Sequence, residues 1–324
     1  VLFRSNNELG LPLTVFRLRD EDEIAVLEMG ISDFGEMHRL ASIAQPNTCV
    51  ITNIGTCHLE NLGDRDGVLK AKTEVFDHLK PDATVILNGD DDKLVTVKEV
   101  QGRRPIYFGL NEEFPLYADE IESKGLKGIA CRIHTPKGTF SVVVPIPGHH
   151  MVYNALAGTA VGLAYGMELS EIQKGIESLQ SLSGRFHIIE NEKYTIVDDC
   201  YNANPMSMKA SLGILKDAMG RKVAILGDMG ELGENEKELH REVGTFAGNC
   251  GIELLICVGT LAKEIAEAAK ESSIQAEKQL EAVSFDTLEE LLMHLGEQVK
   301  RGDTILVKAS HFMNFGKIVE ALQK

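Results

Sequence analysis

The chain has 324 residues, more than the roughly 250–300 at which a single hydrophobic core stops growing, so two domains are expected. Hydrophobic residues make up 44% and charged residues 25%, a balance typical of globular proteins and not of disordered or fibrous ones. The net charge of −16 argues against nucleic acid or an anionic membrane as the main partner, because both bind clustered positive charge.

The chain carries no pattern that would direct it out of the cytoplasm. Its start does not resemble a signal peptide, and the longest run without charged residues, 138–167, contains two Pro and two His and is no membrane span. The six cysteines form no C-x-x-C pair, which favours reduced thiols. We therefore expect a cytoplasmic protein. The sequence begins with Val1 and not Met, so we interpret it as a piece of a longer chain.

The first half alternates strands with helices, which predicts a mostly parallel sheet. Strands are expected at 23–29, 48–54 and 84–88, and helices at 34–44 and 64–79. Between 116 and 147, short strands separated by Gly and Pro predict antiparallel hairpins added to that sheet. A helix is expected at 151–166, and a further one starts at Ser170, where Gln173 completes a capping box.

After Ser183 the alternation starts again. The expected strands are 194–199, 222–227, 252–258, 283–285 and 303–308, and the expected helices are 206–219, 235–249, 260–271, 287–299 and 315–322. The fold class is therefore α/β with two doubly wound domains. Residues 1–182 are expected to form a domain with a mostly parallel sheet and appended antiparallel strands, and residues 183–324 a Rossmann-like domain.

Polar residues follow the predicted strands, where open α/β sheets bind their ligands. The segment VITNIGTCHLENLG (50–63) starts as a buried strand and then places Asn53 and His58 at its end. Glu28 ends the strand at 23–29, and a carboxylate, an imidazole and phosphate oxygens together suit Mg²⁺. Taken singly, Glu28 reads as a solvated side chain and His58 as an ordinary loop residue; their expected position at one edge of one sheet favours a metal site.

Lys72 lies in the helix that follows, in LKAKTEVF, with apolar neighbours. Lys70 and Lys72 point about 200° apart on a helix, so they cannot both be surface charges on one face. One of them is expected to turn inward, and the ordinary alternative is a lysine whose stem covers apolar surface while its charge reaches water.

The second half holds three further strand-end candidates. VDDCYNANPMSM places Tyr201, Asn202 and Asn204 where they can face a heterocycle or a peptide, or simply cap the next helix. Asp228 ends the strand before GDMGELG. Lys308 stands in LVKASHFM, either as an anion site or as a plain basic turn.

A phosphate-binding loop of the form G-x-x-x-x-G-K-[ST] occurs nowhere in the sequence. An ATPase built on this fold would need that loop upstream of Val1. We expect the 324 residues alone to be unable to turn over ATP.

Together these stretches resemble the Mur ligase family along essentially the whole chain. The most specific segments are NNELGLPLTV, LEMGISDFGEMHRL, TNIGTCHLENLG, AKTEVF, GHHMVYNALAG, DDCYNANPMSM and LGDMGELGENEKELH. YNANP followed by SM, together with GDMGELG, resembles the branch that adds D-alanyl-D-alanine. The resemblance implies that the domain at 1–182 is ATPase-like, and the family's UDP-binding domain and phosphate loop would precede this chain.

The resemblance implies roles for named residues. Glu28, His58 and Lys72 become ligands of catalytic Mg²⁺, with Lys72 carbamylated into a carboxylate-like group and His58 and Lys72 counted as catalytic. The residues implied around ATP are His150, Asn154, Arg185, Tyr201 and Asn202. The residues implied near the other substrates, or in domain closure, are Asn53, Asn204, Asp228 and Lys308.

The implied reaction is an ATP-dependent amide ligation through an acyl phosphate in peptidoglycan precursor synthesis. The implied partners are UDP-N-acetylmuramoyl-tripeptide and D-alanyl-D-alanine. We expect no nucleic-acid partner and no membrane insertion, and we expect the protein to be a monomer. Two positions depart from the family pattern: Met151 replaces Asn, and KASHFM replaces KGSRxM, so that His311 stands where Arg is common. Two alternatives remain open, another Mur or folylpolyglutamate-type ligase and a non-catalytic nucleotide-binding paralogue.

Overall fold

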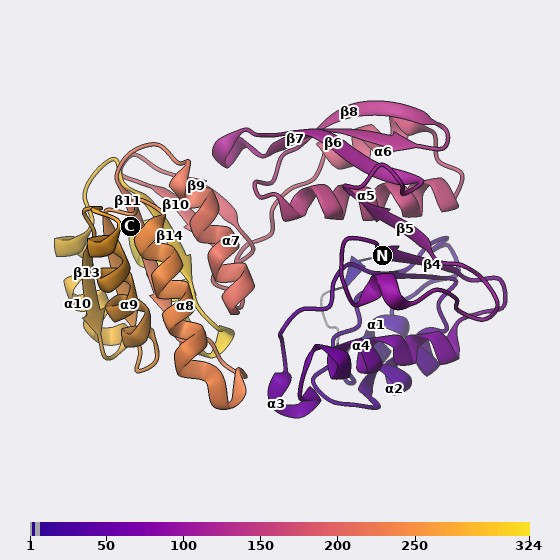
Figure 1. Cartoon of the computed structure of the whole chain (residues 1–324), viewed down its shortest axis with the longest axis horizontal. Coiled ribbons are helices and arrows are strands. Elements are labelled where there is room, and N and C mark those ends of the chain that lie inside the picture. Colours follow the sequence, from indigo (N-terminus) through magenta and orange to yellow (C-terminus); the bar gives the residue numbers. More distant parts are fainter. Residues whose placement is uncertain (1, 4–6) are drawn as a thin grey trace. The chain divides into compact units, whose positions relative to one another are not determined.

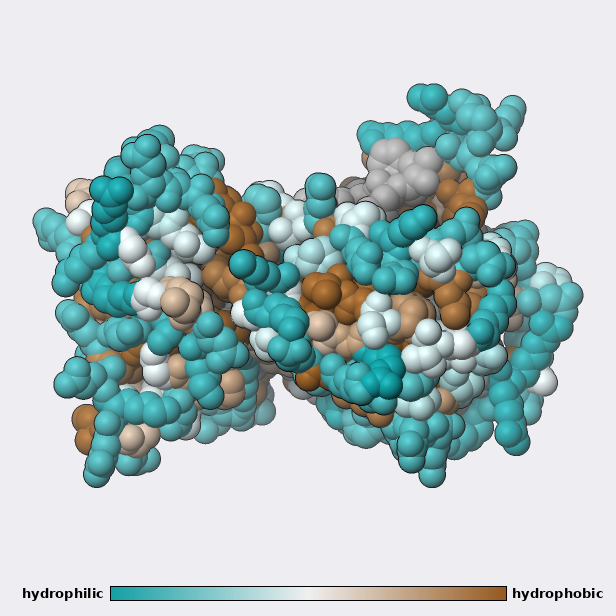
Figure 2. All heavy atoms as spheres, turned by 90° about the horizontal axis from the view of Figure 1, so that it is seen from above, coloured by the Kyte–Doolittle hydropathy of each residue, from teal (hydrophilic) through white to brown (hydrophobic). Residues whose placement is uncertain are grey.

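The computed structural model describes residues 2–3 and 7–324, which divide into two compact units (Figure 1). The first comprises 1–121, 131–142 and 152–176, and the second comprises 122–130, 143–151 and 177–324. The face drawn in Figure 2 is mostly hydrophilic, with smaller apolar areas between the charged side chains. Among the described residues, no helix is long and apolar enough to cross a membrane.

The first unit is built on a six-stranded sheet with the order β3-β4-β5-β6-β7-β8. These strands are Thr48–Ile51, Thr84–Asn88, Ile106–Gly109, Leu116–Ser123, Ile129–Thr135 and Gly138–Val144. From β3 to β6 each neighbouring pair is parallel. Only two residues join β7 to β8, a connection that antiparallel strands allow and parallel ones do not. The predicted parallel sheet with appended hairpins is confirmed, although β5 was not foreseen.

One expectation about this sheet is wrong. β2 (Val26–Leu27), within the strand expected at 23–29, pairs in parallel with β1 (Leu2–Phe3) in a separate two-stranded sheet. Only two residues of the expected seven form ladder bonds, because Ile24 and Val26 are exposed and give the strand no buried face against the larger sheet. Glu28 and His58 therefore follow strands of two different sheets.

The helices of the first unit are α1 (Gly10–Val15), α2 (Glu36–Ala44), α3 (Leu59–Leu62), α4 (Arg65–Thr73), α5 (His150–Ala164) and α6 (Leu169–Glu177). Four of them, α2, α4, α5 and α6, lie where the sequence predicted helices, and α1 and α3 were not predicted. Asp64 caps the start of α4 by accepting a hydrogen bond from the Gly67 backbone. The 3₁₀ helix η1 (Glu74–His78) follows directly after the end of α4. The expected capping box at Ser170 is wrong: α6 begins one residue earlier, and the Glu171 carboxylate accepts from the Glu168 backbone.

The second unit has a six-stranded sheet of order β13-β12-β11-β14-β10-β9. The strands are β9 (His187–Glu190), β10 (Thr195–Asp198), β11 (Lys222–Gly227), β12 (Leu254–Val258), β13 (Glu281–Phe285) and β14 (Thr304–Lys308). All neighbours are parallel except β9, an antiparallel edge strand that the sequence did not indicate. The helices are α7 (Pro205–Lys216), α8 (Glu236–Asn249), α9 (Ala262–Gln275), α10 (Leu288–Gln298) and α11 (Gly316–Leu322). The Rossmann-like prediction is confirmed.

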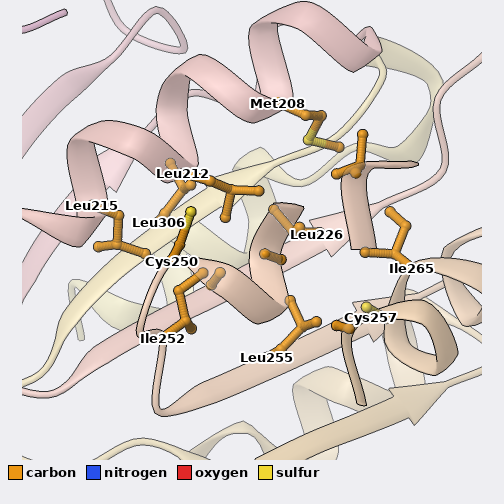
Figure 3. Close-up of a cluster of buried hydrophobic side chains, with 14 of the residues drawn as sticks. Met208, Leu212, Leu215, Leu226, Cys250, Ile252, Leu255, Cys257, Ile265 and Leu306 are labelled. Carbon is orange, nitrogen blue, oxygen red and sulfur yellow. The ribbon is translucent and has the colours of Figure 1, made fainter. Parts of the chain in front are cut away.

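Two hydrophobic clusters cover the two faces of this second sheet, as a buried parallel sheet requires. β12 is buried along its whole length. Figure 3 shows one cluster, in which Met208, Leu212 and Leu215 of α7 and Ile265 of α9 pack onto strand residues Leu226, Leu255 and Leu306. The sheet and its carboxyl-end loops are thereby held on a continuous core.

Helices α8 and α9 pack closely because two glycines face the partner helix. A Cβ at Gly244 would stand 2.3 Å from the Ile265 carbonyl oxygen, and one at Gly248 would stand 2.5 Å from that of Ala269. These distances are far below van der Waals contact, and the obstructing atoms are backbone. The two positions therefore accept no side chain unless the helices move apart.

We expect Gly244→Ala to lower the free energy of unfolding by about 1–3 kcal/mol, the usual cost of overpacking. Gly213, in α7, is the matched control, because a Cβ there meets nothing within 4 Å. Gly213→Ala should be neutral or stabilising by up to about 1 kcal/mol, as helix propensity favours Ala. Denaturant midpoints measure both effects. Equal midpoints for the two variants would contradict the packing argument.

Candidate active site

Lys72 of α4 lies against the turn that follows β3. Its Nζ donates a hydrogen bond of 2.9 Å to the Asn53 carbonyl oxygen. Burial lowers the pKa of this amine, while Cys57 and Asp91 act in the opposite direction. Of the two lysines on the helix, Lys72 is therefore the one turned inward, and Lys70 is exposed.

His58 is half-buried at the start of α3, with a backbone φ of 59°. This left-handed conformation is uncommon outside glycine, although histidine adopts it more often than most residues. Such conformations cluster at functional sites, where the surrounding structure holds them. Asn53 is exposed and contributes its backbone carbonyl to Lys72, and Glu28 is exposed just after β2.

The residues expected to hold Mg²⁺ fit that ion by their chemistry. Among the described residues, no group of three or more His, Cys, Asp or Glu side chains could hold a metal. The expected set contains only two such residues, Glu28 and His58, and its third ligand would be made from Lys72. Burial favours the neutral amine of Lys72, the form that adds carbon dioxide, and a carbamate is an oxygen ligand of the kind Mg²⁺ prefers.

Three aspartates follow β4, and the sequence had not singled them out. They bind the segments around the carboxyl end of this sheet. Asp90 accepts hydrogen bonds from the Leu110 backbone at 2.6 Å and from the Tyr153 hydroxyl at 3.1 Å. Asp91 accepts from the Ile54 backbone in the turn after β3, and Asp92 accepts from the Arg65 side chain of α4. The signal that could have found them is the one used for Glu28, an acidic residue at a strand end.

Helix α5 carries two of the expected nucleotide residues. Asn154 is exposed, one position after Tyr153, which Asp90 anchors. Burial, assisted by Asp90, raises the pKa of Tyr153 to about 12, so its hydroxyl remains a proton donor. His150 is exposed in the first turn of the helix, preceded by Gly148 with a φ of 115°.

Two aspartates at the end of β10 bind the segment around Gly184. Asp198 is 3% exposed and accepts from the Gly184 backbone at 2.7 Å and from the Cys200 thiol at 2.9 Å. Asp199 accepts from the Phe186 backbone at 3.0 Å. Both carboxylates therefore act on backbone geometry, and they fix residues 184–186 to the second unit.

Arg185 and Tyr201 form the exposed part of this region. The guanidinium carbon lies 4.1 Å from the centre of the Tyr201 ring, a cation–π contact. The His311 ring meets the same tyrosine edge-on, with centroids 5.8 Å apart. Asn202 is exposed alongside, and its side chain accepts from the Ala203 backbone. The structure thus brings Arg185 and Tyr201 together with Asn202 next in the chain.

Lys308 is buried beneath that surface. It is 2% exposed, and its Nζ donates to Asp199 Oδ2 at 2.7 Å and to the Asn202 carbonyl oxygen at 3.0 Å. Ser211 donates to the same carboxylate at 2.6 Å. The ammonium therefore has its partners within the protein and supports the loop that carries Tyr201 and Asn202.

Asp228 and Asn204 also make internal contacts. Asp228 accepts from the Ala262 backbone at the start of α9 at 2.6 Å, a position where a negative charge is favoured. Asn204 caps α7 in a capping box with Ser207, and Pro205 occupies the first helical position. These contacts match the helix-capping alternative that the sequence left open for Asn204.

Comparison with known proteins identifies the family. A family model described as Mur ligase middle domain matches residues 3–162, and one described as Mur ligase, glutamate ligase domain matches residues 184–311. UDP-N-acetylmuramoyl-tripeptide–D-alanyl-D-alanine ligase of Bacillus subtilis is 35% identical over 98% of this chain and 68% of its own length. The Escherichia coli ligase of that name is 32% identical, with 98% and 69% covered. The chain belongs to the Mur ligase family of ATP-dependent amide ligases.

Solved structures agree with this assignment. MurF from Acinetobacter baumannii superposes with a TM-score of 0.86 at 32% identity, covering 98% of this chain and 69% of that one. MurF from Thermotoga maritima, in complex with ADP, gives 0.81 at 28% identity, covering 97% and 70%. The chain thus spans about two thirds of these ligases, with the fold of their middle and C-terminal domains.

His240 of α8 generates a prediction about stability and pH. It is fully buried, its Nε2 accepts from the Met229 backbone, and burial lowers its pKa below the ordinary 6.5. The unfolded chain therefore binds a proton more readily, so the stability from neutral His240 is complete above about pH 6.5 and is lost as pH falls through the folded-state pKa.

We expect His240→Gln to lower the free energy of unfolding at pH 7.5 and to flatten its decline between about pH 6.5 and 5. Urea titrations across that range measure the effect. His294→Gln is the control, because His294 is exposed beside Glu297. If His240→Gln keeps the wild-type pH dependence, then His240 does not carry it.

Proposed function

We propose that the chain provides the central and C-terminal domains of a ligase that joins D-alanyl-D-alanine to UDP-N-acetylmuramoyl-tripeptide in peptidoglycan precursor synthesis. The observation that carries the proposal is similarity over 98% of the chain to relatives bearing that name. We place the domains at 1–182 and 183–324, in keeping with family matches that end at 162 and resume at 184. The proposed enzyme acts as a cytoplasmic monomer.

In this proposal Glu28, His58 and carbamylated Lys72 hold Mg²⁺. The ion, when bound, neutralises charge on the phosphates of ATP. The contribution of the chain is to fix the ligands: the Asn53 carbonyl holds the Lys72 amine, and the left-handed backbone of His58 sets the direction of its ring. Such positioning and charge neutralisation account for most catalysis of phosphoryl transfer.

We assign nucleotide binding to His150, Asn154, Arg185, Tyr201 and Asn202. Arg185 lies over the Tyr201 ring, and in this proposal the pair contacts the base. Asn53 and Asn204 remain candidates for substrate contact. For Lys308 and Asp228 the internal hydrogen bonds favour an indirect role, in which each fixes a strand-end loop that faces the dipeptide or the closing domain.

The proposed reaction has two steps. The terminal carboxylate of the tripeptide attacks the γ-phosphorus of ATP, which breaks the bond to ADP and forms an acyl phosphate. The amine of D-alanyl-D-alanine then attacks the acyl carbon, phosphate leaves, and the amine loses its proton as the amide forms. The two domains are joined near Ser183–Arg185, and their closure would keep water from the acyl phosphate.

The alternatives predict different substrates. Another Mur or folylpolyglutamate-type ligase would consume ATP with a different amine, and a non-catalytic paralogue would bind nucleotide without consuming it. The YNANP loop, at 201–205, supports the dipeptide.

We expect the 324-residue chain alone to release no phosphate from ATP with Mg²⁺ and both substrates, because it contains no phosphate-binding loop. With the upstream coding region restored, phosphate release should require both substrates, and mass analysis should find the pentapeptide product. Release by the 324 residues alone would contradict the first expectation, and release without the dipeptide would favour a sister ligase.

In the restored enzyme, Lys72→Ala should lower kcat by about 100-fold or more, because both a metal ligand and its charge are lost. Added formate or acetate should recover part of the activity of Lys72→Ala, since a small carboxylate can take the place of the carbamate. Lys70→Ala is the matched control on the same helix and should keep activity. Full activity of Lys72→Ala would refute the proposed metal site.

A further inference from the structure

The turn after β3 is held by side chains from several elements. Asn88, at the end of β4, donates its Nδ2 to the Thr52 carbonyl oxygen at 3.0 Å. Lys72 donates to the next carbonyl, that of Asn53, at 2.9 Å. Two consecutive carbonyl groups beyond the ladder of β3 are therefore bound by side chains instead of by a neighbouring strand.

Ile54, the next residue, has both its backbone groups bound. Its N–H donates to Asp91 Oδ2 at 2.8 Å, and its carbonyl oxygen accepts from Arg65 Nε at 2.9 Å. Its side chain is 2% exposed, so packing in the hydrophobic core also holds this residue in place. A rotation of the Asn53–Ile54 peptide, which carries the partner of Lys72, would break the bond to Asp91.

Asp91 is itself rigidly placed. Its side chain is 7% exposed, and its second oxygen, Oδ1, accepts from the Lys93 and Leu94 backbones at 3.0 and 2.9 Å, where the 3₁₀ helix η2 (Leu94–Thr96) begins. Both carboxylate oxygens are thus in use, one on its own loop and one on the turn. An amide in this place would have a single acceptor oxygen for both tasks.

Arg65 connects the same turn to the helix of Lys72. The two residues are seven positions apart on α4 and so share one helix face, from which they bind consecutive carbonyls, those of Ile54 and Asn53. The guanidinium also forms a fork with Asp92, at 3.0 and 2.5 Å, and lies 3.7 Å from Asp91. This fork fixes the direction of Nε in a way that a lysine could not reproduce.

We propose that Asp91 and Arg65 are positioning residues, which fix the Asn53–Ile54 turn and through it the Lys72 amine for the ligase reaction. The inference rests on the proposed role of Lys72 in catalysis. Neither residue needs to touch substrate, because each acts on the peptide that holds Lys72. Lysine has a long and flexible stem, so its catalytic position depends on where its hydrogen-bond acceptor stands.

Asp91→Asn and Arg65→Lys test the proposal with little change in shape. Asp82→Asn and Arg103→Lys are the matched controls, because Asp82 and Arg103 form an ion pair in the same unit but elsewhere, beyond the end of η1. Thermal unfolding of all four variants checks that each is folded at the assay temperature. The substitutions at the two pairs are the same, so a difference between pairs reflects their location.

The first measurement uses the 324-residue chain and needs no activity. Brief acetylation with acetic anhydride, followed by mass analysis of the 70–72 region, gives the ratio of Lys72 to Lys70 labelling. In the wild type this ratio should be low, since Lys72 is half-buried and hydrogen-bonded and Lys70 is exposed. Asp91→Asn and Arg65→Lys should raise it several-fold, and the controls should leave it unchanged. An unchanged ratio in both test variants would overturn the proposal.

The second measurement uses the enzyme with its upstream region restored. Asp91→Asn and Arg65→Lys should lower kcat by about 10- to 100-fold, as loss of a group supporting a catalytic ligand does, with little change in KM for the dipeptide. Wild-type kcat in variants whose Lys72 labelling has risen would also overturn the proposal. Full activity of Lys72→Ala would instead refute the role of Lys72 itself, so the two failures are distinguishable.

Discussion

Parallel sheets leave backbone groups unpaired at the carboxyl ends of their strands, and this constraint governs the candidate site. The ladder ends there, yet the chain must turn beside buried elements, where an unpaired N–H or C=O costs about 1–3 kcal/mol. In the first unit Asn88, Lys72 and Arg65 bind the carbonyl groups of Thr52, Asn53 and Ile54, and Asp91 binds the Ile54 N–H. These four side chains therefore have a backbone partner before any ligand is considered.

The second unit meets the same constraint with a buried ion pair. Lys308, the last residue of β14, pairs with Asp199 after β10, and each also binds backbone of the segments that bear Arg185, Tyr201 and Asn202. Replacing a buried pair by apolar residues is often neutral, but removing one partner costs about 3–5 kcal/mol because a charge is left without compensation. The pair thus specifies one loop geometry more than it adds stability, and an exposed Arg185–Tyr201 stack requires that geometry.

The sequence predicted what depends on local pattern and strand order. Alternating apolar runs predicted the two α/β sheets. Helix spacing indicated that Lys70 or Lys72 turns inward, and the position after a strand singled out Tyr201. What it could not give depends on pairing between distant segments. β2 carries the apolar residues of a strand, but the sequence did not indicate that it pairs with β1 and leaves Val26 exposed. Likewise, Lys308 reads as a free cation until Asp199, 109 positions away in sequence, is seen beside it. The close α8–α9 packing at Gly244 is invisible to a hydrophobicity pattern.

Internal pairing would let an acidic protein bind the anionic substrates that we propose for it. The chain carries a net charge of −16, and ATP and a nucleotide-linked peptide are both negatively charged. Free carboxylates near phosphates would repel them. The aspartates at these strand ends are not free: Asp90 and Asp91 accept backbone N–H groups, Asp92 pairs with Arg65, and Asp199 pairs with Lys308. Their charge is directed into the protein. Glu28 is exposed just after β2, where a bound cation would balance its charge.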